Sequence, residues 1–256
     1  MRIRRSAGVF TLAPCLAFLG AWILARPVPA AAAPVPVLVE AFTSEGCSSC
    51  PPADAYLGEL DRTQPIAGAT VLAIEEHVDY WDGLGWRDPF AMPDNGARQR
   101  AYARVLEDHG VFTPEVVLDG QRIVRPQDAA SAARAIAEAA RAPHARVSVG
   151  RTGERLSIDI SGLPALSPGE RAGIWLAVTE SGLVSRVERG ENAGRTLPHA
   201  PVLRSLRRIG SLTQGNPATH LEATMDTSAS WRTSNLRAVV FLQTDDLRQI
   251  VGVGSP

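Results

Sequence analysis

Lysine is absent from the 256-residue chain, and only three residues are cysteine. The sequence also has no internal repeat, no phosphate-binding glycine loop and no recognisable Ser-His-Asp arrangement. A formal net charge of −1 gives no reason to expect a nucleic-acid partner, because such proteins usually carry a clustered positive excess. The chemistry of the chain must therefore come from a small set of residues, of which the cysteines are the most informative.

The first 33 residues have the three parts of a secretory signal. Residues 1–5 are basic, residues 7–25 are apolar, and small residues follow up to Ala33. We therefore expect the rest of the chain to be exported. Membrane contact is expected only if the segment stays uncleaved, since its apolar stretch is almost long enough to cross a bilayer. Cleavage of residues 1–33 would remove Cys15 and four arginines, and would take the net charge from −1 to about −5.

The remaining two cysteines form the motif Cys47-Ser48-Ser49-Cys50, between an apolar, β-branched run and a helical pattern that starts with Pro51-Pro52. A cysteine at a helix N-terminus has a lowered thiol pKa because it meets unpaired backbone N–H groups and the positive end of the helix dipole. This favours Cys47 as the nucleophile and Cys50 as the resolving thiol. A static disulfide and half of a metal site are the alternatives, although zinc would need two further ligands.

The periodicity predicts two domains after the signal. In residues 34–143 we expect the order βαβαββα, with strands at 36–42, 70–78, 115–118 and 122–124 and helices at 47–62, 94–109 and 128–141. Asp119-Gly120 predicts a tight hairpin between the last two strands. Alternating residues with Gly and Pro punctuation in residues 144–256 predict an all-β, sandwich-like domain of about seven strands.

The strand that leads into Cys-x-x-Cys, followed later by Phe112-Thr113-Pro114, resembles the thioredoxin fold. The stretches Val39–Asp54, His77–Phe90 and Arg189–His199 resemble, more narrowly, the DUF1223 family of exported bacterial proteins, which have a thioredoxin-like domain and no settled activity. The resemblance implies that the protein resides in the periplasm or cell envelope of a bacterium. It also implies that Pro114 follows a cis peptide bond and, with Thr113, contacts a substrate beside Cys47. A trans proline at a strand start is the alternative.

Two further groups of residues are candidates for the site. Tyr80, Trp81 and Trp86 suggest a structured recognition loop beside the dithiol, or else a small satellite core. Glu40, on the strand before the motif, could take a proton from Cys50 if it is buried, and would have no such role if it is exposed.

The polar stretch over residues 189–199 could hold a ligand, dock against the first domain, or satisfy its own hydrogen bonds. It carries Arg189, Glu191, Asn192, Arg195 and His199.

The sequence thus predicts an exported thiol–disulfide oxidoreductase that acts on protein thiols or disulfides, recycled by an unidentified redox partner, with no cofactor. The alternative is a binding module without enzymatic activity. It would either carry copper, since Cys47, Cys50 and His77 together would suit Cu(I), or contact an envelope protein through a fold held by a structural disulfide.

Overall fold

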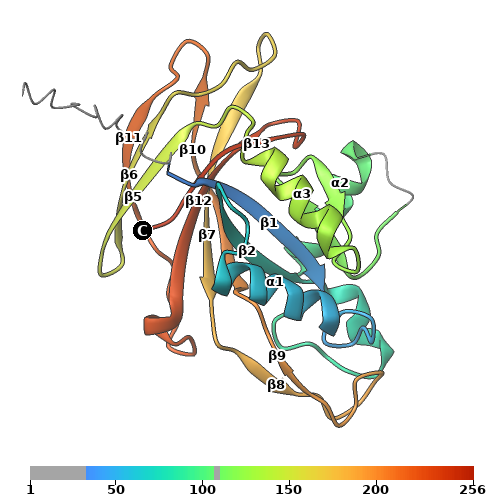
Figure 1. Cartoon of the computed structure of the whole chain (residues 1–256). Coiled ribbons are helices and arrows are strands. Elements are labelled where there is room, and N and C mark those ends of the chain that lie inside the picture. The colour runs from blue at the N-terminus through green and yellow to red at the C-terminus, as the bar shows by residue number, and fades with distance from the viewer. Residues whose placement is uncertain (1–32, 107–109) are drawn as a thin grey trace, which may run out of the picture. The chain divides into compact units, whose positions relative to one another are not determined.

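The computed structural model describes residues 33–106 and 110–256, and residues 33–256 form one compact unit (Figure 1). The expected signal segment, Ala33 apart, lies outside the described residues. No described helix combines the length and the hydropathy needed to cross a membrane.

The helices are α1 (Pro51–Thr63), α2 (Pro93–Val105) and α3 (Ala129–Ala139), with the 3-10 helices η1 (Asp79–Leu84) and η2 (Thr233–Asn235). The strands are β1 (Val35–Thr43), β2 (Ala69–His77), β3 (Glu115–Leu118), β4 (Arg122–Val124), β5 (Arg146–Thr152), β6 (Arg155–Ser161), β7 (Arg171–Glu180), β8 (Val184–Arg186), β9 (Thr196–Pro198), β10 (Val202–Thr213), β11 (Thr219–Thr224), β12 (Leu236–Thr244) and β13 (Ile250–Gly254).

The first half has the predicted element order. Strand β1 pairs in parallel with β2 and antiparallel with β3, which forms the expected hairpin with β4. All three helix starts differ from the prediction, that of α3 by one residue because Asp128 is its N-cap. Helix α1 begins at Pro51 with Cys50 at its N-cap, so Cys47 lies in the preceding turn, and α2 begins at Pro93 with Met92 at its N-cap. Proline sets the starts of α1 and α2 because its missing N–H costs nothing in the first helical turn.

The strands of the second half pack in two facing layers around a core of residues 145–251, and one of these layers continues into the sheet of the first half. Strand β10 pairs in parallel with β2 and antiparallel with β7, so the described residues form one eight-stranded mixed sheet in the order β13-β12-β7-β10-β2-β1-β3-β4. A three-stranded antiparallel sheet, β11-β6-β5, packs on the β7 and β12 part of the large sheet. The boundary expected near residue 143 thus separates a mixed α/β half from a half made mostly of strands. Strands of both halves belong to the same eight-stranded sheet.

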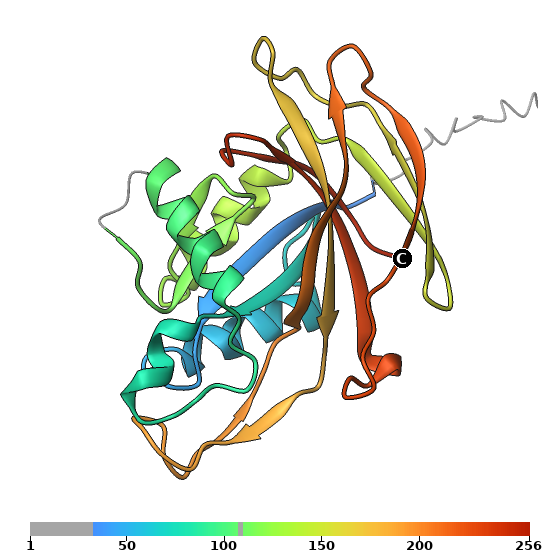
Figure 2. The same ribbon diagram turned by 180° about the vertical axis from the view of Figure 1, so that it is seen from behind.

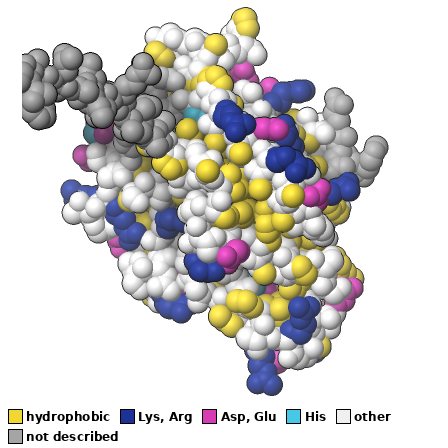
Figure 3. Space-filling view, in the orientation of Figure 1, with side chains coloured by type: hydrophobic (Ala, Val, Ile, Leu, Met, Phe, Trp, Pro, Cys, Tyr) yellow, Lys and Arg dark blue, Asp and Glu magenta, His cyan; other side chains and the backbone are white. Residues whose placement is uncertain are grey.

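The large sheet is strongly curled (Figures 1 and 2). Its β13 edge returns to the β3–β4 hairpin, where the Ile250 N–H donates to the Asp119 carbonyl at 2.8 Å. One side of β1 and β2 packs against α1 and α3, and the other side faces β7, β10, β12 and β13. Figure 3 shows hydrophobic side chains gathered across the face that carries α1 and α3. Because β1 and β2 run parallel, their carboxyl ends lie at the same end of the sheet, where the candidate site forms.

Candidate functional site

The two cysteines form a disulfide between the end of β1 and the start of α1. Cys47 is 1% exposed and Cys50 is fully buried. The Ser49 hydroxyl lies 3.3 Å from the Cys47 sulfur and donates to the Thr113 carbonyl at 3.4 Å. The dithiol thus lies beside the Thr113–Pro114 turn, in a conformation that hides both sulfurs.

A loop of the second half covers the turn that holds the disulfide. The buried Asn192 amide donates to the carbonyls of Glu45 and Cys47 at 2.8 and 2.9 Å. Its neighbour Glu191 accepts a bond from the Ser48 N–H at 3.0 Å. Hydrogen bonding from Ser48, through its side chain first and its backbone N–H second, lowers the pKa of the Glu191 carboxyl. The stretch over residues 189–199 therefore docks on the dithiol turn, one of the arrangements left open by the sequence. We call these contacts of Glu191 and Asn192 the clasp.

The aromatic segment predicted as a recognition loop is structured and adjoins the same turn. Trp81 donates to the Thr113 hydroxyl at 2.8 Å, and Trp86 donates to Glu45 at 2.7 Å. Tyr80 donates to Gln99 at 3.1 Å. Trp81 also packs on the core around Phe42. Two of these rings therefore orient the loops on either side of the dithiol.

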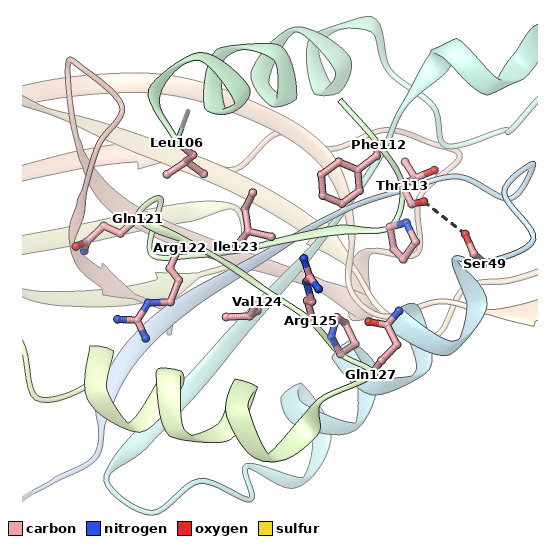
Figure 4. A pocket seen from close by; sticks show the side chains of 12 residues that line it. Ser49, Leu106, Phe112, Thr113, Gln121, Arg122, Ile123, Val124, Arg125 and Gln127 are labelled. Atoms are coloured by element: carbon pink, nitrogen blue, oxygen red, sulfur yellow. Dashed lines mark hydrogen bonds between the residues drawn. The ribbon is translucent and has the colours of Figure 1, made fainter. Parts of the chain in front are cut away.

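A groove opens next to Ser49 and the Thr113–Pro114 turn (Figure 4). The Thr113–Pro114 peptide bond is cis, the geometry implied by the resemblance. The groove has a volume of about 780 Å³ and runs from Ser49 and Pro114 along the chain from Gln121 to Gln127. Phe112 lines it and is 44% exposed. An extended, partly apolar chain segment could lie there, with Pro114 and Ser49 at one end.

Glu40 is buried, but its partners differ from those expected. Its two carboxylate oxygens accept bonds from Arg98 at 2.7 Å and from the Tyr102 hydroxyl at 2.7 Å. Arg98 also faces Glu76, whose pKa is raised well above its usual range by burial and by the charge of Glu40. Glu40 is therefore a member of a buried ion-pair network against α2.

Asp54, which the sequence reading missed, is a second buried carboxylate and lies one helical turn after Cys50. Its backbone N–H donates to the Cys50 carbonyl at 3.1 Å, and its side chain accepts a bond from the Thr43 hydroxyl at 2.8 Å. Burial, followed by the charge of Glu75, raises the pKa of Asp54 well above its usual value. No local pattern distinguishes this aspartate from an ordinary residue of a first helical turn.

His77 lies at the end of β2, as predicted, but its ring does not join the cysteines. Its Nδ1 lies 2.7 Å from Asp88, and its Nε2 faces Glu75 at 3.6 Å. Burial alone would lower the pKa of His77, but the charges and hydrogen bonds of Asp88 and Glu75 outweigh it and raise that pKa well above the usual value. Among the described residues, His77 groups with Glu75 and His199, and neither cysteine belongs to this group.

The fold and the site together define a mixed α/β protein with a buried Cys-x-x-Cys disulfide, a cis-proline turn and a cluster of buried carboxylates and histidines. The chain belongs to the DUF1223 family, described as proteins of unknown function, whose sequence profile matches residues 38–243.

The chain resembles the X-ray crystal structure of a protein from Agrobacterium tumefaciens, with 25% sequence identity and a TM-score of 0.67, over 87% of this chain and 94% of that one. A hypothetical protein from Pyrococcus horikoshii aligns over 44% of this chain and 83% of its own, with 7% identity and a TM-score of 0.19, which is too low to indicate a shared fold. No curated protein matches the chain.

Proposed function

We propose that this protein is an exported thiol–disulfide exchange protein of thioredoxin-like fold, in which Cys47 and Cys50 exchange electrons with cysteines of a polypeptide substrate. The observation that carries the proposal is the placement of the Cys47–Cys50 pair beside the cis-Pro114 turn and the adjoining groove. The order βαβαββα and the strand order β2-β1-β3-β4 support the thioredoxin-like assignment.

In the oxidised protein, a substrate thiolate attacks the Cys47 sulfur and the Cys47–Cys50 bond breaks. A mixed disulfide forms at Cys47, and Cys50 leaves as a thiolate. A second substrate thiolate then attacks the substrate sulfur of that mixed disulfide, which yields a substrate disulfide and a reduced dithiol. The reverse sequence reduces a substrate disulfide. An unidentified redox partner would then reoxidise the reduced Cys47–Cys50 pair, or reduce the oxidised pair after the reverse sequence.

Asp54, rather than Glu40, supplies or accepts the proton at Cys50. Residues four apart share one helix face, and Asp54 follows Cys50 by four residues in helical backbone. Burial raises the pKa of Asp54 and so favours the protonated carboxyl, the form that can supply a proton to Cys50. We expect Asp54→Asn to slow exchange and flatten its pH dependence. Glu59→Gln, on the exposed part of the same helix, should leave both unchanged.

Exchange requires the closed turn to open, since the Cys47 residue is 1% exposed. The clasp residues Glu191 and Asn192 hold the turn from outside, while Ser49 holds it against Thr113. Release of these contacts would expose Cys47 toward the groove. Phe112 offers an apolar contact to a polypeptide substrate there.

The same burial favours a second candidate, a binding protein whose disulfide is purely structural. Exchange assays on a peptide with one disulfide, in glutathione buffer, separate the two. We expect turnover by the wild-type protein, none by Cys47→Ser, and an accumulating mixed disulfide at Cys47 in Cys50→Ser. If the wild-type rate equals that of the double variant Cys47→Ser/Cys50→Ser, the disulfide is structural.

A further inference from the structure

Three buried side chains meet where β2 ends and the chain enters β10. Glu75 and His77 lie on β2, and His199 follows β9. The Glu75 N–H donates to the Pro201 carbonyl at 2.8 Å, and this bond brings the residues before β10 to the end of β2. The side chains of Glu75, His77 and His199 are 0%, 1% and 2% exposed. One possible ligand atom from each lies within 4.8 Å of the others.

One ring nitrogen of each histidine contacts a carboxylate outside the group of three. His77 Nδ1 lies 2.7 Å from Asp88, and His199 Nε2 lies 3.1 Å from Glu45. Because a carboxylate accepts hydrogen bonds, each of these nitrogens carries a ring proton, and in the neutral ring the other nitrogen has a free lone pair. Histidines that bind metals are typically oriented by a carboxylate in this way.

The two free nitrogens point at the Glu75 carboxylate. His77 Nε2 and His199 Nδ1 each lie 3.6 Å from the same oxygen, Glu75 Oε2. Neither nitrogen nor either carboxylate oxygen of Glu75 has a hydrogen-bond partner among the described residues. Three buried acceptors that face one another without a donor are unfavourable, so a positive charge between them would be strongly stabilised.

The spacing favours a metal ion over a shared proton. Hydrogen bonds to oxygen are about 2.7–3.2 Å long, shorter than the two separations of 3.6 Å. Ligands that bind zinc tetrahedrally at about 2.0–2.2 Å lie roughly 3.4 Å from one another. A proton would also join only two of the three groups, whereas a metal ion satisfies all three.

We propose that Glu75, His77 and His199 bind one divalent transition-metal ion of the zinc type. Two imidazoles and one carboxylate suit this class of ion and leave one position for water. The ring of Phe90 lies 5.4 Å from His77 and 5.2 Å from His199 and shields the group on one side. The site is distinct from the dithiol and does not depend on exchange activity.

The test uses the purified protein with its disulfide intact, dialysed against a chelator and then incubated with Zn²⁺ alone. We expect one equivalent of bound zinc by elemental analysis. Glu75→Gln and His199→Gln should lose it. Asp88→Asn should weaken binding about 10–100-fold, as loss of an orienting carboxylate does. His144→Gln is the matched control, because His144 pairs with Asp119 outside the group and should bind zinc normally.

The double variant Cys47→Ser/Cys50→Ser should retain the zinc, which separates this site from a thiol-based one. X-ray absorption at the zinc edge of the wild-type protein needs no variant, and it should show imidazole and oxygen ligands without sulfur. Absence of stoichiometric zinc, a sulfur ligand shell, or full binding by a folded His199→Gln variant would overturn the proposal.

Discussion

The clasp residue Asn192 offers the sharpest test of how the second half of the chain controls the disulfide. Asn192→Asp keeps the side-chain shape but removes the amide that donates to the carbonyls of Glu45 and Cys47. The Cys47 carbonyl would still accept the Cys50 N–H at 3.3 Å, so the Glu45 carbonyl is the one left unsatisfied, at a cost of about 1–3 kcal/mol. We therefore expect the free energy of unfolding to fall by about 1–3 kcal/mol, as measured by urea titration of the oxidised protein.

The same substitution should speed reduction of the disulfide by dithiothreitol. Because about 1.4 kcal/mol corresponds to a factor of ten, the rate should rise roughly tenfold or more if the lost bonds hold the turn closed. Asn235→Asp is the matched control, since Asn235 donates to one carbonyl, that of Ser181. It should leave the reduction rate unchanged. A destabilised Asn192→Asp variant whose disulfide is reduced at the wild-type rate would refute the clasp.

Two further predictions concern stability. Arg98→Met should lower the free energy of unfolding by about 3–5 kcal/mol, because it leaves the buried Glu40 without its cation. Arg122→Ala, which removes an exposed pair, should cost less than about 1 kcal/mol; equal losses in the two urea titrations would contradict the network. The hydrogen bond to Asp119 raises the pKa of His144 despite partial burial, so its stabilisation is complete below about pH 6.5 and is lost as pH rises through the folded-state pKa. His144→Gln should therefore be less stable than the wild type by up to about 1 kcal/mol in acid, with a gap that closes in alkali, and a gap that widens there would show the sign to be wrong.

Local signals were enough to predict most of the first half from the sequence. Hydrophobic periodicity gave the order βαβαββα, and Asp119-Gly120 gave the hairpin with its observed bounds. Proline explains the error at α1. Pro51 and Pro52 occupy the first turn, so the helix starts after the motif and Cys47 lies in the preceding turn.

Contacts between residues distant in sequence could not be predicted in this way. The parallel pairing of Val202 with Glu75 joins the two halves into one sheet. No local sequence pattern predicts this pairing. This pairing brings His199 to His77 and Asn192 to the dithiol turn. The sequence therefore indicated the cysteines, and it left docking of the stretch with Glu191 and Asn192 as one of three alternatives. It did not indicate the carboxylates that orient the histidines.

The most direct test of the exchange proposal is the reduction potential of the Cys47–Cys50 pair, measured by equilibrating the purified protein with glutathione under anaerobic, metal-free conditions. We predict a value within the range spanned by exchange proteins, roughly −270 to −120 mV. A value well below about −300 mV, typical of structural disulfides, would contradict the proposal.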